Sequence, residues 1–176
     1  MKIIKTKFKS LVLFKNKNFF DTRGLLREIY KKKIQQKNII FDYFSISKRN
    51  VIRGLHFQFP QQEKIITVIK GRIIDYCLDL RRNSKTFLQV YRTHLSQKNG
   101  KSIFVPKGFA HGFISLESEN ILLYKNSTYH SPNNEISINI FDKDLKIIKY
   151  KNSYKLSKKD IEGLSLNDFL NKYKTL

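Results

Sequence analysis

The sequence predicts an all-β fold, a jelly-roll antiparallel barrel with a short helical C-terminus. Strand-like segments dominate from residue 8 to about residue 150, and turn residues separate them at fairly regular spacing. Short strands in this arrangement are typical of an antiparallel sandwich or barrel. Helical signals are confined to the end of the chain. No repeat, linker or composition break divides the 176 residues, so we expect one domain over residues 1–176.

Two β-rich runs, 65–69 and 72–80, flank Lys70-Gly71, a turn signal, and are expected to form a hairpin. Further strands are expected at residues 87–95, 102–105, 112–116, 121–125 and 135–141. Near the end, Ser157 and Ser165 each stand three positions before an aspartate, a pattern that indicates the start of a helix. Small barrels of this kind close their edges and leave a central cavity.

Composition favours a packed protein, with 40% hydrophobic and 13% aromatic residues. Cys77 is the only cysteine, so no intramolecular disulfide forms, and we expect a small buried side chain there. The apolar stretch 11–14 is too short for the core of a signal peptide, and no later run could cross a bilayer. These features predict a cytoplasmic protein without a membrane partner.

The formal net charge of +21 is the feature that most favours a polyanion partner. Lysine and arginine neutralise phosphates and release counterions, as nucleic-acid binding requires. Here, however, the lysines are spread along almost the whole chain instead of clustering. A solvated basic surface is therefore favoured over a nucleic-acid site, and a small substrate that carries phosphate is compatible with it.

The densest candidate run for chemistry is 51–58, Val-Ile-Arg-Gly-Leu-His-Phe-Gln. A histidine side chain ordinarily titrates near neutral pH, so a residue of this type can take a proton in one step and return it in another, which makes His56 a candidate. Taken alone, it is more often a structural, hydrogen-bonded histidine. Strict alternation puts Arg53 and His56 on opposite faces of a strand. The two share a site only if Gly54 forms a bulge.

Three other residues are candidates because of their positions. Alternation puts Lys64 on one face with Ile66 and Val68, where it either extends to solvent or faces the cavity and holds an anion. Asp75 stays unassigned, because either face of its strand could point inward. His111 stands between two expected strands, and nearby glycines leave the backbone open to a ligand.

Five runs occur in an order that carries a resemblance: 21–24 (Asp-Thr-Arg-Gly), 50–58 (Asn-Val-Ile-Arg-Gly-Leu-His-Phe-Gln), 109–113 (Phe-Ala-His-Gly-Phe), 124–125 (Tyr-Lys) and 156–160 (Leu-Ser-Lys-Lys-Asp). Together they resemble the dTDP-4-dehydrorhamnose 3,5-epimerase family over roughly residues 15–165. The resemblance implies a cupin-like jelly roll, a homodimer, no cofactor and a sugar-nucleotide substrate. It also implies a place in deoxysugar and polysaccharide biosynthesis.

The resemblance implies roles for four catalytic residues. His56 matches the base, and Asp160 matches the carboxylate that orients the base and stabilises its protonated form. Tyr124 matches the acid that reprotonates the sugar. Lys64 matches the cation beside the C4 oxygen, where it stabilises enolate charge. Such a site removes and returns protons at C3 and C5, which are acidic because both carbons adjoin the C4 ketone.

The resemblance also implies a set of substrate-binding positions. Arg23, Glu28 and Arg53 match nucleotide and phosphate contacts, and His111 matches a further substrate contact. The remaining positions are peripheral or depart from the family pattern: Phe19, Glu135 and Lys159 match peripheral positions, Phe41 and Tyr43 stand where the family has Gln and Asn, and His130 stands where it has a tyrosine that stacks on the base.

No metal is expected. The usual metal-binding cupin pattern has two histidines one residue apart, and none of the four histidines here is so placed. The predicted reaction converts dTDP-4-dehydro-6-deoxyglucose to dTDP-4-dehydrorhamnose by inversion at C3 and C5. Three alternatives stay open: an epimerase that inverts C3 only, a 3,4-ketoisomerase, and a non-catalytic basic cupin that binds carbohydrate or nucleic acid.

Overall fold

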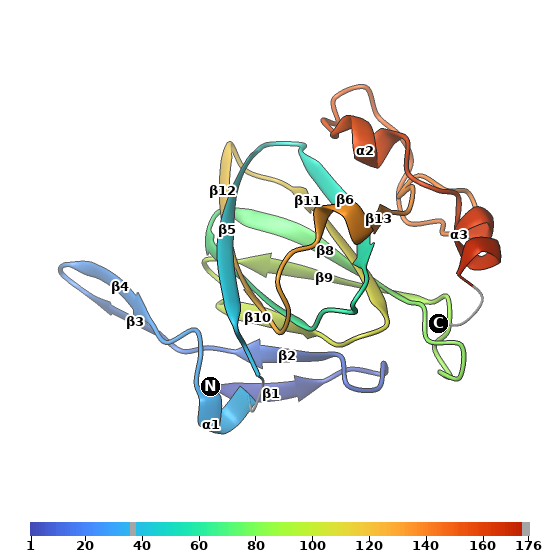
Figure 1. Ribbon diagram of the computed structural model, residues 1–176. Coiled ribbons are helices and arrows are strands. Elements are labelled where there is room, and N and C mark those ends of the chain that lie inside the picture. Colours follow the sequence, from blue (N-terminus) through green and yellow to red (C-terminus); the bar gives the residue numbers. More distant parts are fainter. Residues whose placement is uncertain (36–37, 174–176) are drawn as a thin grey trace.

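Two antiparallel sheets face each other in the computed structural model, which describes residues 1–35 and 38–173 (Figure 1). In spatial order, the larger sheet comprises β1 (Lys2–Lys5), β2 (Val12–Lys15), β10 (Lys101–Val105), β7 (Lys64–Lys70), β12 (Glu119–Asn126) and β5 (Phe41–Lys48). The smaller comprises β13 (Glu135–Ser137), β6 (Ile52–Gln58), β11 (Phe109–Ser115), β8 (Arg72–Asp79) and β9 (Val90–Ser96). The jelly-roll prediction is confirmed.

The remaining elements lie outside the two sheets. β3 (Asn18–Asp21) and β4 (Gly24–Arg27) pair as a hairpin that stands away from the barrel (Figure 1). The helices are α1 (Lys32–Gln35), η1 (Pro132–Asn134), α2 (Lys158–Ile161) and α3 (Leu166–Lys172). As predicted, Ser157 and Ser165 cap α2 and α3, and each side chain accepts a hydrogen bond from the backbone of the aspartate three residues on. None of the helices in the described ranges is long and apolar enough to span a bilayer.

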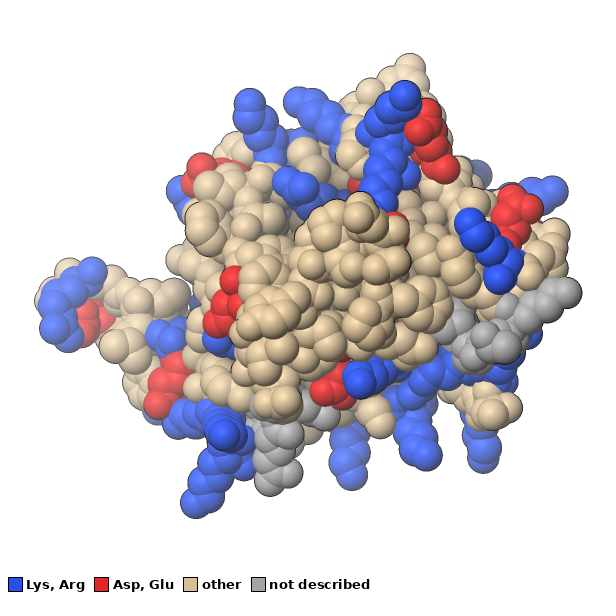
Figure 2. Space-filling model, viewed as in Figure 1, with Lys and Arg blue, Asp and Glu red and all other residues tan. Residues whose placement is uncertain are grey.

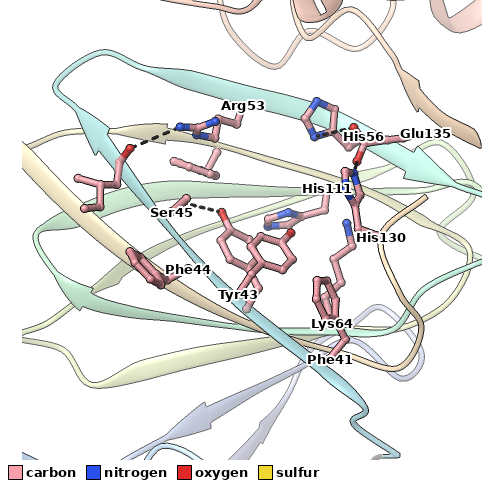
Figure 3. Close-up of a pocket in the computed structure, with 13 residues that line it drawn as sticks. Phe41, Tyr43, Phe44, Ser45, Arg53, His56, Lys64, His111, His130 and Glu135 are labelled. Atoms are coloured by element: carbon pink, nitrogen blue, oxygen red, sulfur yellow. Dashed lines mark hydrogen bonds and ion pairs between the residues drawn. The ribbon is translucent and has the colours of Figure 1, made fainter. Parts of the chain in front are cut away.

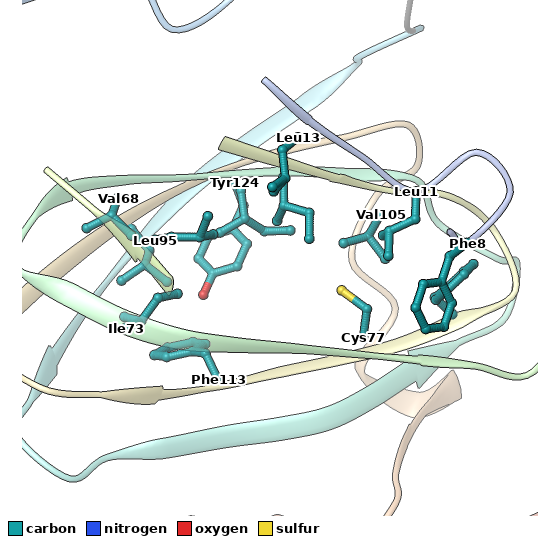
Figure 4. Close-up of a cluster of buried hydrophobic side chains, with 14 residues drawn as sticks. Phe8, Leu11, Leu13, Val68, Ile73, Cys77, Leu95, Val105, Phe113 and Tyr124 are labelled. Atoms are coloured by element: carbon teal, nitrogen blue, oxygen red, sulfur yellow. The ribbon is translucent and has the colours of Figure 1, made fainter. Parts of the chain in front are cut away.

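Apolar side chains fill three layers. The main core lies between the sheets and contains Val68, Ile73, Leu95, Phe113 and Tyr124, with Cys77 among them (Figure 4). A second cluster joins the outer face of the smaller sheet to the C-terminal segment, and a third covers the outer face of the larger sheet. Because both faces of β8 are covered, its alternation alone could not show which face is the interior.

The hairpin predicted for 65–69 and 72–80 is wrong. β7 pairs with β10 and β12 in the larger sheet, whereas β8 pairs with β9 and β11 in the smaller one. Gly71, with φ +84°, turns the chain from one sheet into the other. A Cβ there would lie 2.5 Å from the carbonyl oxygen of Glu119, so the turn requires glycine.

Three predicted strand boundaries also need correction. Residues 87–89 precede the strand, with 87 and 88 in a turn, because Ser84 and Thr86 bend back to donate hydrogen bonds to the buried Asp79 carboxylate. The strand predicted for 135–141 ends at Ser137, after which Ile138 forms a parallel bridge with the C-terminal segment. The strand predicted for 112–116 begins at Phe109, so His111 lies within a strand and not between two.

Gly54 allows Arg53 and His56 to share a pocket. Along the β6–β11 ladder Arg53 is opposite Phe113 and His56 is opposite His111, so two residues of β6 face one residue of β11. Gly54 has φ +103° at this irregularity. The extra residue changes the alternation, and both side chains line the same pocket. The bulge that the sequence required is present.

We expect Gly54→Ala to destabilise the fold by about 3 kcal/mol or more, as collisions in a packed core do. Its Cβ would lie 2.5 Å from the His111 carbonyl oxygen and 2.8 Å from the Gly112 Cα. Gly24→Ala is the matched control, because Gly24 also has positive φ (+130°) but open space around it. Urea unfolding of both variants separates the collision from the backbone cost. Equal losses in the two variants would contradict a tight contact at Gly54.

Candidate active site

A pocket of about 650 Å³ opens between the two sheets (Figure 3). This is a size typical of small-molecule sites. Its walls combine titratable and aromatic side chains from β5, β6, β7, β11, β12, β13 and the segment that leads into β13. The lining residues are Phe41, Tyr43, Phe44, Ser45, Ile46, Arg53, His56, Lys64, His111, Phe113, Tyr124, His130 and Glu135.

His56 is bonded to a carboxylate from the far end of the chain. Its Nε2 lies 2.6 Å from Asp160 Oδ1, and Ser137 donates to the same oxygen at 2.8 Å. Burial alone would raise the pKa of Asp160, but the hydrogen bonds from His56, Ser137 and Ser157 outweigh it and hold that pKa below its ordinary value. Asp160 therefore stays ionised and fixes the ring. Nδ1 is then the nitrogen available to take a proton.

Tyr124 approaches the pocket from the opposite sheet. Its ring stacks on that of Tyr43, with centroids 4.5 Å apart and planes 12° from parallel. Its hydroxyl oxygen lies 3.4 Å from the Ser45 hydroxyl (Figure 3). Burial, and then the neighbouring Tyr43, raise the pKa of Tyr124, while burial raises that of Tyr43 to about 12. Both phenols are protonated at neutral pH, so each can donate.

Lys64 supplies a positive charge to the same pocket. It shares a face of β7 with Ile66 and Val68, as alternation predicts, and the structure shows that this face points into the cavity. Burial lowers its pKa, and the opposing effect of Glu135 is smaller. Desolvation strengthens electrostatic interactions inside such a site. An oxygen that gains negative charge near Lys64 is accordingly stabilised.

The inward face of β8 contributes a residue that sequence reasoning left unassigned. Asp75 Oδ2 lies 2.7 Å from His111 Nε2, and both side chains are buried. Cys77 Sγ lies 3.5 Å from the other carboxylate oxygen. Among the described residues, these three are the group that could hold a metal ion. This group supplies three protein ligands. Burial and Asp75 raise the pKa of the Cys77 thiol well above its ordinary value, and the charge of Lys64 offsets only part of this. The signal for Asp75 was its period-two spacing with Cys77.

The structure separates the remaining predicted site residues into two groups. Phe41, Tyr43, Arg53, His111, His130 and Glu135 line the pocket with the catalytic candidates, and Lys159 borders an adjoining cleft behind His56. Phe19, Arg23 and Glu28 lie in or beside the protruding β3–β4 hairpin and do not line that pocket. Ser45 and Ser137 were not singled out in the sequence, because short hydroxyl side chains carry no pattern of their own.

Comparison with known proteins decides the family. The family model for dTDP-4-dehydrorhamnose 3,5-epimerase matches residues 5–168. This chain belongs to the dTDP-4-dehydrorhamnose 3,5-epimerase family. The members of this family are isomerases. The five sequence runs indicated the same family.

Relatives of the dTDP-4-dehydrorhamnose 3,5-epimerase family match nearly the whole chain. The enzyme of Shigella flexneri is 32% identical over 176 residues, with 96% of this chain and 97% of that protein covered. The Bacillus anthracis epimerase, solved with TDP and PPi, is 38% identical, with a TM-score of 0.88 and coverage of 94% and 99%. The Legionella pneumophila enzyme, solved with dTDP-4-keto-L-rhamnose, is 34% identical, with a TM-score of 0.88 and coverage of 94% and 93%.

Proposed function

We propose that this protein converts dTDP-4-dehydro-6-deoxyglucose to dTDP-4-dehydrorhamnose by inversion at C3 and C5. One observation carries the proposal: a histidine paired with a carboxylate comes from one sheet, and a protonated tyrosine comes from the facing sheet. Inversion requires a base on one side of the sugar ring and an acid on the other. The pocket offers both.

In the proposed reaction, His56 Nδ1 takes the proton from C3 or C5. The electron pair of the broken C–H bond moves into the enolate, whose charge rests on the C4 oxygen beside Lys64. Asp160 stabilises the imidazolium that forms. Tyr124 then gives its phenolic proton to the carbon from the opposite side, and exchange with water restores both side chains. Each inversion leaves the sugar with the same atoms in a new configuration.

The nucleotide side of the pocket is proposed to use Arg53, Phe41 and Tyr43. The Arg53 guanidinium donates to Ser47 Oγ at 3.1 Å and to the Ile46 carbonyl oxygen at 3.4 Å, which fixes its charge at the pocket wall, where a phosphate can meet it. Phe41 and Tyr43 lie next to each other, with ring centroids 5.6 Å apart, and give this wall an aromatic surface. His111, His130, Glu135 and Lys159 complete the proposed substrate-binding set.

We propose that a second copy of the chain receives the β3–β4 hairpin. Phe20 and Leu26 are 74% and 64% exposed on it, and exposed apolar surface of this kind indicates a protein interface. Insertion into a partner would bring Arg23, Glu28 and Phe19 to a pocket from which they are absent within one chain. The proposed unit is thus a homodimer of single-domain chains in the cytoplasm.

Phe20→Asp is expected to give a monomer with a raised KM. Loss of the Arg23 contact with a phosphate would raise KM at least about tenfold, because a hydrogen bond to a charged group contributes roughly 1.5–3 kcal/mol. Light scattering after gel filtration and initial-rate kinetics measure the two effects. Tyr150→Asp, at an exposed aromatic on the C-terminal segment, is the control. A dimeric Phe20→Asp variant with normal KM would contradict the hairpin's role.

Solvent deuterium incorporation tests the proposed reaction. Purified protein is incubated in D₂O with the 4-keto sugar nucleotide, and proton NMR follows the C3 and C5 signals. We expect exchange at both carbons. Exchange at C3 alone would indicate a C3 epimerase, and a 3-keto product would indicate the ketoisomerase. Absence of exchange would contradict an enzymatic role and favour a binding protein.

Charge on the visible surface gives no separate support for nucleic-acid binding. Lys and Arg side chains surround an uncharged centre on the face in Figure 2, and they do not merge into one continuous patch. Nucleic-acid sites instead gather positive charge on a face or along a groove.

A further inference from the structure

A second carboxylate lies beside the ring of His56, at the nitrogen that Asp160 leaves open. Glu135 Oε1 is 3.9 Å from His56 Nδ1, whereas Asp160 is 2.6 Å from Nε2. The longer distance exceeds that of a hydrogen bond. Figure 3 shows Glu135 between the rings of His56 and His130. The base therefore has one bonded carboxylate and one that is close but separate.

Two other side chains hold Glu135 in that position. Lys159 Nζ donates to Oε1 at 2.9 Å, and His130 Nε2 lies 3.1 Å from Oε2. Lys159 and Asp160 are neighbours on α2, so one short helix presents a cation to Glu135 and a carboxylate to His56. Burial would raise the pKa of Glu135, but His56, Lys159 and Lys64 outweigh it and lower that pKa. Glu135 is thus an anion at neutral pH.

We propose that Glu135 sets the basicity of His56, and that Lys159 and His130 restrain Glu135 from closing onto Nδ1. This inference rests on the proposed function, in which Nδ1 takes the substrate proton. A carboxylate 3.9 Å away stabilises the imidazolium once it forms, yet leaves Nδ1 unoccupied beforehand. A direct bond would block the nitrogen that has to react. Glu135, Lys159 and His130 are in this sense positioning residues.

The charge distribution around His56 explains why a second carboxylate is useful. Arg53 and Lys64 line the same pocket as His56, and nearby cations disfavour the protonated form of a histidine. Glu135 offsets them on the side where the proton arrives. Among the described residues, titratable and charged groups face His56 from every element around it. From the larger sheet come Tyr43 on β5, Lys64 on β7 and Tyr124 on β12. From the smaller sheet come Arg53 on β6, His111 on β11 with its partner Asp75 on β8, and Glu135 on β13, and from outside the sheets come His130, Lys155, Lys159 and Asp160.

The test is an NMR titration of the His56 imidazole in the full-length protein, with the signal assigned from the spectrum of His56→Gln. We expect Glu135→Gln to lower the midpoint by about one pH unit, since a nearby opposite charge shifts a titration by roughly this amount. Lys159→Met should move the midpoint in the opposite direction, because Glu135 is then free to approach Nδ1. The acidic limb of the pH profile of kcat/KM should move in the same two directions.

Matched variants separate this coupling from general charge and from folding. Lys158→Met removes a charge from the same helix at a side chain that is 86% exposed and pairs with Glu162, so the midpoint should stay unchanged. Lys159→Arg keeps the cation and should restore the wild-type midpoint. Shifts of the same sign in Glu135→Gln and Lys159→Met, or an equal shift in Lys158→Met, would overturn the proposal. The titration needs no turnover, so it decides the coupling even if deuterium exchange fails and the proposed reaction falls.

Discussion

His56→Asn should reduce deuterium exchange at both C3 and C5 on the order of 10³-fold, within the range that a general base contributes. Asparagine keeps a polar side chain near Asp160 but has no group that takes a proton at neutral pH. Exchange is expected to fall together with inversion, because proton removal precedes every later step. Proton NMR of the recovered sugar nucleotide in D₂O measures both quantities in one sample.

His94→Asn is the control for this substitution, since His94 lies exposed on β9 and should leave exchange unchanged. For Asp160→Asn we expect a loss of exchange that lies between those of His94→Asn and His56→Asn. The substitution keeps the base but removes the charge 2.6 Å from Nε2, so we expect a smaller loss than in His56→Asn. Substantial exchange in His56→Asn would exclude His56 as the base.

Tyr124→Phe should uncouple exchange from inversion. Phenylalanine keeps the ring that stacks on Tyr43 and loses only the hydroxyl near Ser45. His56 can still take a proton, exchange it with solvent and return deuterium to the same face. We therefore expect deuterium to enter the recovered substrate, while formation of the inverted product falls by about 10²–10³-fold. Mass and NMR analysis of substrate and product in the same reaction separates the two events.

Tyr91→Phe makes the same chemical change at a half-buried tyrosine that packs against the core, and should affect neither quantity. It controls for the loss of a hydroxyl in general. Equal and mild losses of exchange in His56→Asn and Tyr124→Phe would count against both assigned roles.

Sequence alone was sufficient for the architecture and for the residues whose positions follow from local rules. Alternation put Lys64 on the same face as Ile66 but left open whether it reaches the cavity, and the capping serine predicted the helix that carries Asp160. The requirement for a bulge at Gly54 was also a local inference, because no other arrangement puts Arg53 and His56 on one face. These predictions depend only on neighbours along the chain.

Pairings between distant segments were beyond local reasoning. His56 and Asp160 are 104 positions apart, and no periodicity connects them; only the family resemblance did. Asp75 stayed unassigned because both faces of β8 are buried: the main core covers the inner face, and the C-terminal segment covers the outer face. The turn at Gly71 looked like a hairpin because a sharp reversal within one sheet and a step between two sheets use the same residues.

The position of α2 also bears on how the protein acquires activity during synthesis. The barrel strands from β5 to β13 precede residue 138, so the pocket walls leave the ribosome before the carboxylate of Asp160 does. Until the C-terminal segment settles on the outer face of the smaller sheet, His56 lacks its bonded partner Asp160, and Glu135 lacks its hydrogen bond from Lys159. A newly made chain therefore completes its pocket walls first, and His56 gains its carboxylate partner only when the last segment has docked.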